Sequence, residues 1–128
     1  MFDRIRSFFK NPCLRKSMAY KAPPMPEWGK IVEIMNEKRP DYFKDEVIEV
    51  ICSKDRTMRC VILKDEKGFL TYVLEKIFVF DEEEWEYVSR SDGALPAMWN
   101  TVIGGGLFDS MTELLRELKA EPEYKLYF

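Results

Sequence analysis

The sequence contains no histidine and only three cysteines among its 128 residues. Without imidazole, nucleophiles of the Ser-His and Cys-His type and histidine-ligated metals are excluded. The cysteines Cys13, Cys52 and Cys60 form no CxxC pair, and three scattered thiols cannot complete a zinc site. We therefore expect no catalytic residue, no metal and no cofactor.

Long apolar runs are also missing. The longest mostly apolar stretch, residues 77–80, is far too short to span a bilayer. The first ten residues include the charged side chains Asp3, Arg4, Arg6 and Lys10, and no apolar run of signal length follows them. These absences predict a cytoplasmic protein. Cys52 and Cys60 flank a predicted hairpin across which they could face one another, and we expect two reduced, half-buried strand thiols.

What the sequence does contain is an apolar fraction of 46 %, enough for a folded core, and an uneven distribution of charge. The net charge of −3 combines a basic segment over residues 1–26 with an acidic one over residues 81–128. Such asymmetry predicts a basic leading arm and an acidic face on the folded body. A nucleic-acid-binding protein would instead carry basic charge over its folded part, so we expect no nucleic-acid partner.

Residues 1–26 are interpreted as this arm. Phe2, Ile5 and Phe9 share one face of a predicted helix over residues 1–10, which would pack on the domain or anchor the chain to a membrane surface. We favour packing, because so short a helix is marginal alone. Residues 11–26 are predicted to be an irregular, proline-rich linker.

Residues 27–128 are predicted to form a single domain. A helix begins near Pro26, presents the apolar stripe Trp28, Ile31, Val32 and Met35, and is stopped by Pro40. A last helix begins at Ser110, with Glu113 completing a capping box, and ends at Pro122. The aromatic tail 124–128 would pack on the body or add an edge strand.

The centre of the chain has the pattern of strands. Strands are predicted over 47–52, 58–64 and 69–80, with a hairpin at Gly68 and a bulge near residues 75–76. A turn at 81–84 leads to a predicted fourth strand over 85–90, and 99–103 is one more extended piece. The predicted fold is α+β: N-terminal helices, an antiparallel meander of four to five strands, and a C-terminal helix packed on one face of the sheet.

Two motifs invite a chemical interpretation. Residues 104–106 are three glycines before a helix, as in phosphate-binding loops, but no GK[ST] follows and Asp109 would repel the ligand. The acidic run 81–86 could hold a metal or supply an acid–base pair. On a strand, neighbouring residues point to opposite faces, so these carboxylates would not converge on one ion or substrate. We therefore favour a solvated turn as the first interpretation and an acidic docking patch as the second.

The stretch from Arg59 to the final helix resembles a type of small bacterial domain, similar to stand-alone immunity-type proteins encoded beside polymorphic toxins. The likeness is carried by the Gly68 hairpin, residues 72–76, residues 85–88 and residues 108–113. This resemblance implies a non-enzymatic inhibitor that covers the active site of a cognate toxin.

We therefore expect a protein-binding module whose acidic and aromatic surface docks on a basic protein partner such as a toxin. The alternatives are a small enzyme or ligand-binding domain, with a pocket between sheet and last helix and Glu75 or Glu86 as acid or base, and a peripheral membrane adaptor. The sequence leaves the oligomeric state open. The predicted partner-binding residues are Asp81, Glu82, Glu83, Glu84, Trp85, Glu86, Tyr87, Asp92 and Trp99.

Overall fold

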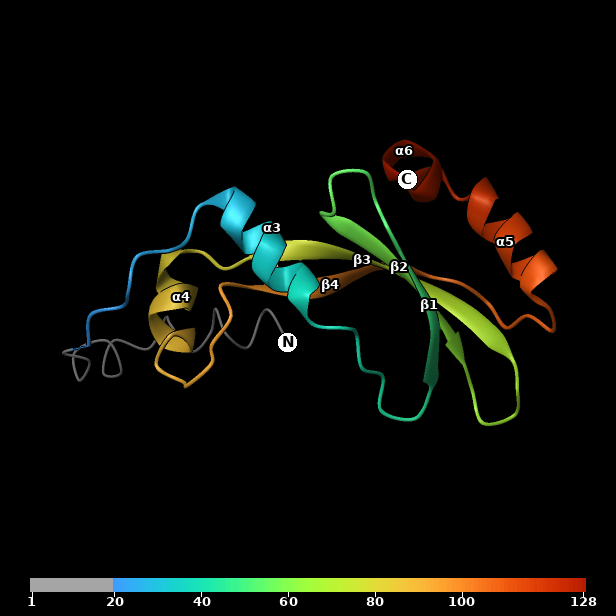
Figure 1. The fold of residues 1–128 in the computed structure, drawn as a ribbon, viewed down its shortest axis with the longest axis horizontal. Coiled ribbons are helices and arrows are strands. Elements are labelled where there is room, and N and C mark those ends of the chain that lie inside the picture. The colour runs from blue at the N-terminus through green and yellow to red at the C-terminus, as the bar shows by residue number, and fades with distance from the viewer. Residues whose placement is uncertain (1–19) are drawn as a thin grey trace.

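The β-branched and apolar runs in the middle of the chain fold into a four-stranded antiparallel sheet (Figure 1). The structure is a computed structural model, and it describes residues 20–128. Each strand pairs with its neighbour in sequence, so the sheet is a meander. The strands are β1 (Glu46–Cys52), β2 (Met58–Lys64), β3 (Leu70–Val79) and β4 (Ala97–Gly104).

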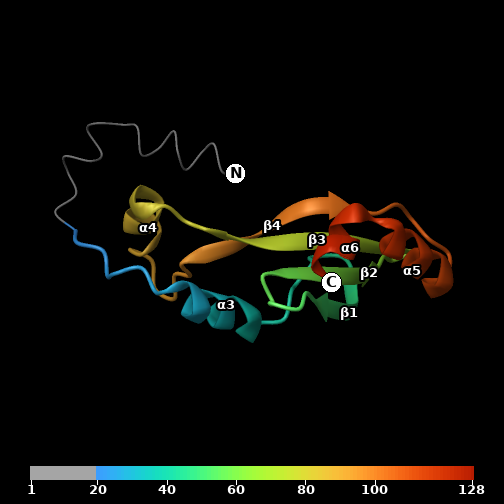
Figure 2. The ribbon, with the colours of Figure 1, turned by 90° about the horizontal axis from the view of Figure 1, so that it is seen from above.

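Helices precede, interrupt and follow the sheet, which confirms the α+β class. The predicted helix over residues 1–10 lies outside the described residues. Helix α4 stands at the opposite end of the molecule from α5 and α6 (Figures 1 and 2). The helices are α3 (Trp28–Glu37), α4 (Glu82–Val88), α5 (Met111–Ala120) and α6 (Pro122–Tyr127).

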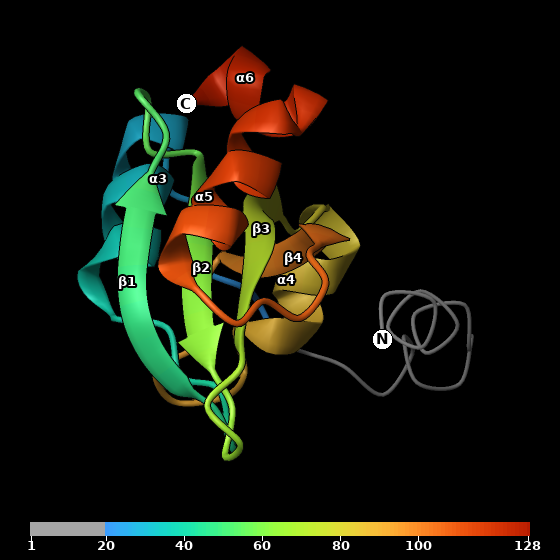
Figure 3. The same cartoon turned by 90° about the vertical axis from the view of Figure 1, so that its right-hand side faces the viewer.

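Both faces of the sheet are packed. On one face, Leu114 and Leu118 of α5 meet Ile62 and Leu74, and all four side chains have no exposed surface. On the other face, the predicted stripe of α3 places Ile31 and Met35 against Ile77 and Ala97. Figure 3 shows the sheet lying between α5 and α3. The chain therefore has two small cores separated by the sheet.

The predicted strand over residues 85–90 is wrong, because this segment is helix α4. Asp81 is its N-cap: the Asp81 carboxylate accepts from the N–H of Glu84 at 2.8 Å, and the Glu84 carboxylate accepts from the N–H of Asp81 at 3.0 Å. The two bonds form a capping box, and the acidic first turn complements the helix dipole. Residues 81–84, predicted to be a turn, are thus the cap and first turn of the helix.

The extended piece predicted at 99–103 forms part of β4, which takes the place of the fourth strand. A register shift with β4 lies close to the predicted position, between Leu74 and Glu75, but the residue left without a partner is Val102, so the bulge belongs to β4 and not to the third strand. A second shift, at Ile48, interrupts the pairing of β1 with β2. Both outer strands of the sheet therefore carry a bulge, a device that disfavours edge-to-edge association.

The aromatic tail, residues 124–128, packs on the body and does not add an edge strand, so the first of its two expected placements is confirmed. It does so as helix α6, whose Tyr124 stacks on Phe128 at 4.7 Å between ring centroids, and both rings contact the α5 core. The expected half-burial of the two cysteines is wrong, although Cys52 and Cys60 are both free thiols, as expected. Cys60 pairs with Ile51 and is fully buried, while Cys52 is exposed, so the two thiols point to opposite faces of the sheet.

Candidate functional site at the acidic helix

Helix α4 concentrates carboxylates because its capping box and first turn are built from them. Its sequence, EEEWEYV, contains no lysine or arginine. Over residues 81–92 the chain carries six acidic residues and one basic residue, Arg90. Negative charge at the amino end of a helix is favoured by the helix dipole, so the fold tolerates this density of like charge.

Burial divides the predicted patch into an inner and an outer part. Glu84 is 1 % exposed and Trp85 is 8 % exposed, so both face the interior. Asp81, Glu82 and Glu83 are exposed. Later in the helix, Glu86 is half-buried and Tyr87 exposed. The helix therefore presents acidic side chains outward, while its tryptophan serves as an anchor.

What Trp85 anchors is the segment that leads into α3. The indole Nε1 of Trp85 donates a hydrogen bond of 2.7 Å to the carbonyl oxygen of Pro23. The hydroxyl of Tyr20 donates to the carbonyl oxygen of Ser89 at 3.2 Å, and the guanidinium of Arg90 lies 4.4 Å from the centroid of the Tyr20 ring. Residues 20–26, which we call the strap, have no regular secondary structure, as predicted, yet they are bound along α4.

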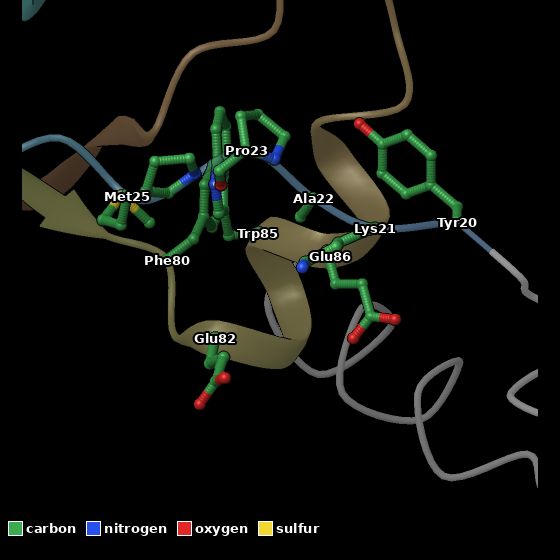
Figure 4. Close-up of a pocket in the computed structure, with 10 residues that line it drawn as sticks. Tyr20, Lys21, Ala22, Pro23, Met25, Phe80, Glu82, Trp85 and Glu86 are labelled. Carbon is green, nitrogen blue, oxygen red and sulfur yellow. The ribbon is translucent and has the colours of Figure 1, made fainter.

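A hollow of about 590 Å³ opens between the strap and α4. Figure 4 shows the carboxylates of Glu82 and Glu86 directed away from the indole of Trp85. The hollow is therefore apolar at its base and acidic at its rim, with one lysine on the strap side. It is lined by Tyr20, Lys21, Ala22, Pro23, Pro24, Met25, Phe80, Glu82, Trp85 and Glu86.

Of the predicted partner-binding residues, Glu82, Trp85 and Glu86 line this hollow, and two others lie outside α4 and its cap. Asp92 is exposed in the turn between α4 and β4 and does not line it. Trp99 lies on β4, where its Nε1 donates to the carbonyl oxygen of Met35 at 3.0 Å. Trp99 therefore belongs to the packing between α3 and the sheet.

Sequence reasoning missed a buried ion pair beside Trp99. The Nε of Arg59 lies 2.7 Å from Oε1 of Glu75, and the two side chains are 8 % and 9 % exposed. The hydroxyl of Tyr42 donates to the other Glu75 oxygen at 2.6 Å. Burial, and then the hydrogen bond to the Glu75 carboxylate, raise the pKa of Tyr42 well above its ordinary value. Arg59 and Glu75 are direct cross-strand partners, so correct register would have revealed the pair.

Other chemical interpretations find little support in the geometry. Within residues 20–128 no group of three histidine, cysteine or carboxylate side chains could hold a metal ion. The N–H of Gly105, in the glycine run, donates to the carbonyl oxygen of Tyr72 at 2.8 Å. That N–H is engaged within the fold, so it does not point into a phosphate-binding loop.

No protein-family model, curated protein or solved structure matches this chain. In the part of the chain from Tyr20 onward, no helix has the length and apolar character needed to cross a bilayer.

Proposed function

We propose that this protein is a non-enzymatic binding module that docks the outer face of α4 on a basic protein surface. The partner class is a basic protein such as a toxin, inhibited by steric cover of its active site, and the location is cytoplasmic. The docking face consists of the exposed carboxylates of Asp81, Glu82 and Glu83, with the rim residue Glu86.

The observation that carries this proposal is the packing between the sheet and α5. A ligand-binding domain of the alternative kind needs a pocket there, but Leu114, Leu118, Ile62 and Leu74 fill the interface with no exposed surface. The carboxylate of Glu75 is bonded to Arg59 and Tyr42 on the opposite face of the sheet. These groups are committed to structure, which favours docking through the exposed surface over a pocket between the sheet and α5.

The concentration of negative charge favours α4, rather than α5 or α6, as the docking helix. Residues 109–125, which include α5 and α6, carry five acidic and three basic residues, so opposite charges are interspersed there. Residues 81–92 carry six acidic residues and one basic residue, so negative charge is concentrated there. A concentrated field of one sign accelerates encounter with an oppositely charged surface.

The test is the association rate with a nonalysine peptide immobilised as a model basic surface. The triple variant Glu82→Lys, Glu83→Lys, Glu86→Lys should associate at least about tenfold more slowly at low salt, and the difference should shrink as salt is added. Glu84 is left unchanged because it is buried in the capping box.

The matched control reverses three exposed glutamates elsewhere, Glu33→Lys, Glu66→Lys and Glu117→Lys, and so changes the net charge equally. It should associate clearly faster than the triple variant at α4. Equal slowing in both variants would show that only net charge matters and would reject the docking face.

A further inference from the structure

A second site lies beside the carboxyl end of α3, around the guanidinium of Arg59. The Arg59 side chain is 8 % exposed and its Nε is bonded to Glu75. Its Cζ lies over the Trp99 ring, 4.0 Å from the ring centroid. Glu75 is in turn held by the hydroxyl of Tyr42. These contacts fix the orientation of the guanidinium, so its two terminal nitrogens are held in place before any ligand arrives.

Over residues 20–128, the terminal nitrogens of Arg59, Nη1 and Nη2, have no hydrogen-bond acceptor; the one hydrogen bond from this side chain is that of Nε. Arg59 lines two neighbouring hollows, of about 360 Å³ and about 270 Å³. A guanidinium edge that is nearly buried and faces a hollow calls for an acceptor, and paired oxygens of one anion match it best.

The smaller hollow is the more basic of the two. It is lined by the cations Lys38, Arg39, Arg56 and Arg59, against the single carboxylate of Glu37. The larger hollow has the additional carboxylate of Asp41 and more apolar walls, including Trp99 and Leu95. Charge therefore places an anion in the smaller hollow.

Arg56 reaches this hollow from a turn that the fold holds firmly. Its φ of 63° lies in the left-handed region, where glycine is the favoured residue. The side chain of Asn36 donates to the carbonyl oxygen of Arg56 at 2.9 Å, which ties the turn between β1 and β2 to α3. The turn would be less strained with glycine, so it carries an arginine at a conformational cost.

We propose that the smaller hollow is a binding site for the oxyanion of a small molecule, a phosphate or carboxylate group. Nη1 and Nη2 of Arg59 bind two of its oxygens, and Arg56 and Lys38 supply the flanking positive charge. This site shares no lining residue with the hollow at α4. It stands independently of the docking face.

The test is a titration of the ¹⁵N-labelled protein with sodium phosphate, followed by amide NMR at ionic strength held constant with sodium chloride. Saturable shifts are expected at residues 36–39 and 56–59. The variant Arg56→Gly should bind phosphate about tenfold more weakly, because one charge-assisted contact is lost. Its melting temperature should not fall, since glycine suits the turn.

The matched control is Lys67→Gln, which removes one positive charge from an exposed turn that does not line the hollow. Its phosphate affinity should equal that of the wild type. A parallel titration with sodium acetate distinguishes the two ligand chemistries, and saturation by either anion at these residues supports the site. If neither anion gives saturable shifts there, or if Arg56→Gly binds as tightly as Lys67→Gln, the proposal is overturned.

Discussion

Arg59 and Glu75 meet across β2 and β3 in a place where both side chains are less than a tenth exposed. Each charge has left water, and the pair is stable because each compensates the other. Strand propensity cannot reveal this, because the same residues on an exposed face would have the same local sequence. The pairing register and the cover from α3 decide it.

Removal of one partner of this ion pair should therefore lower the free energy of unfolding more than removal of both. Arg59→Met leaves the buried Glu75 carboxylate without its countercharge, with only the Tyr42 hydroxyl as a donor, and should lower the free energy of unfolding by about 3 kcal/mol. The double variant Arg59→Met, Glu75→Met should recover much of that loss, because no charge then lacks a partner. Urea unfolding of the wild type, of Arg59→Met, of Glu75→Met and of the double variant measures the coupling. A double variant that loses the sum of the two single losses would contradict the coupling.

The buried thiol of Cys60 should make the free energy of unfolding depend on pH. Burial, and then the charge of Glu49, raise the pKa of the Cys60 thiol from 9.0 to about 12. Between these values the unfolded chain has released the proton and the folded protein has kept it, so the free energy of unfolding falls as pH rises. Cys60→Ala should flatten that decline, whereas Cys52→Ala, at an exposed position, should leave it unchanged. Equal declines in all three proteins would assign the effect to other groups.

At the level of helices and strands, the periodicity of apolar residues was sufficient to predict most of the fold. The apolar stripe of α3, the apolar runs of β2 and β3, and the cap of α5 at Ser110 are all local patterns that the structure confirms. One member of the α3 stripe departs from the prediction, because Trp28 is 51 % exposed. α4 was missed although Asp81 and Glu84 have capping-box spacing, because alternating Trp85 and Tyr87 resemble a strand. Whether so short a segment of seven residues forms a helix depends on its N-cap and on the strap that is bound to Trp85.

The cap of α4 can be separated from its charge. Asp81→Ala should lower the free energy of unfolding by about 1 kcal/mol, because the N–H of Glu84 loses its acceptor. Asp81→Ser removes the same charge but keeps a capping oxygen, so it should remain close to the wild type. Thermal unfolding followed by circular dichroism measures both. Equal destabilisation by serine and alanine would show that charge, rather than capping, holds the helix.

The link between β4 and α5 depends on one glycine. A Cβ at Gly105 would lie 2.5 Å from the ring of Tyr72, whereas a Cβ at Gly104 or Gly106 would meet nothing within 4 Å. Gly105→Ala should therefore destabilise the protein by about 1–3 kcal/mol, through displacement of the Tyr72 ring, and Gly104→Ala should cost less. Denaturant unfolding of the two variants compares them directly, and equal losses would contradict the steric account.

For the whole molecule, sequence indicated the sign and extent of charge but not its placement. The acidic segment was visible as composition, and the structure places its densest part, over residues 81–92, on and next to a single helix at one end of the fold (Figure 1). The basic hollow was not predictable, because its lining comes from residues 36–40, two positions on β1, Arg56 and Arg59. Only the folded meander brings those segments together.

The docking face on α4 can be mapped by amide NMR of the labelled protein with a free nonalysine peptide. The peptide should shift amides at residues 81–92 at low salt and leave those of α5 and α6 nearly unchanged, because bases there offset the acids. Shifts centred on residues 109–125, or spread evenly over every exposed acid, would contradict the assignment of the docking face to α4.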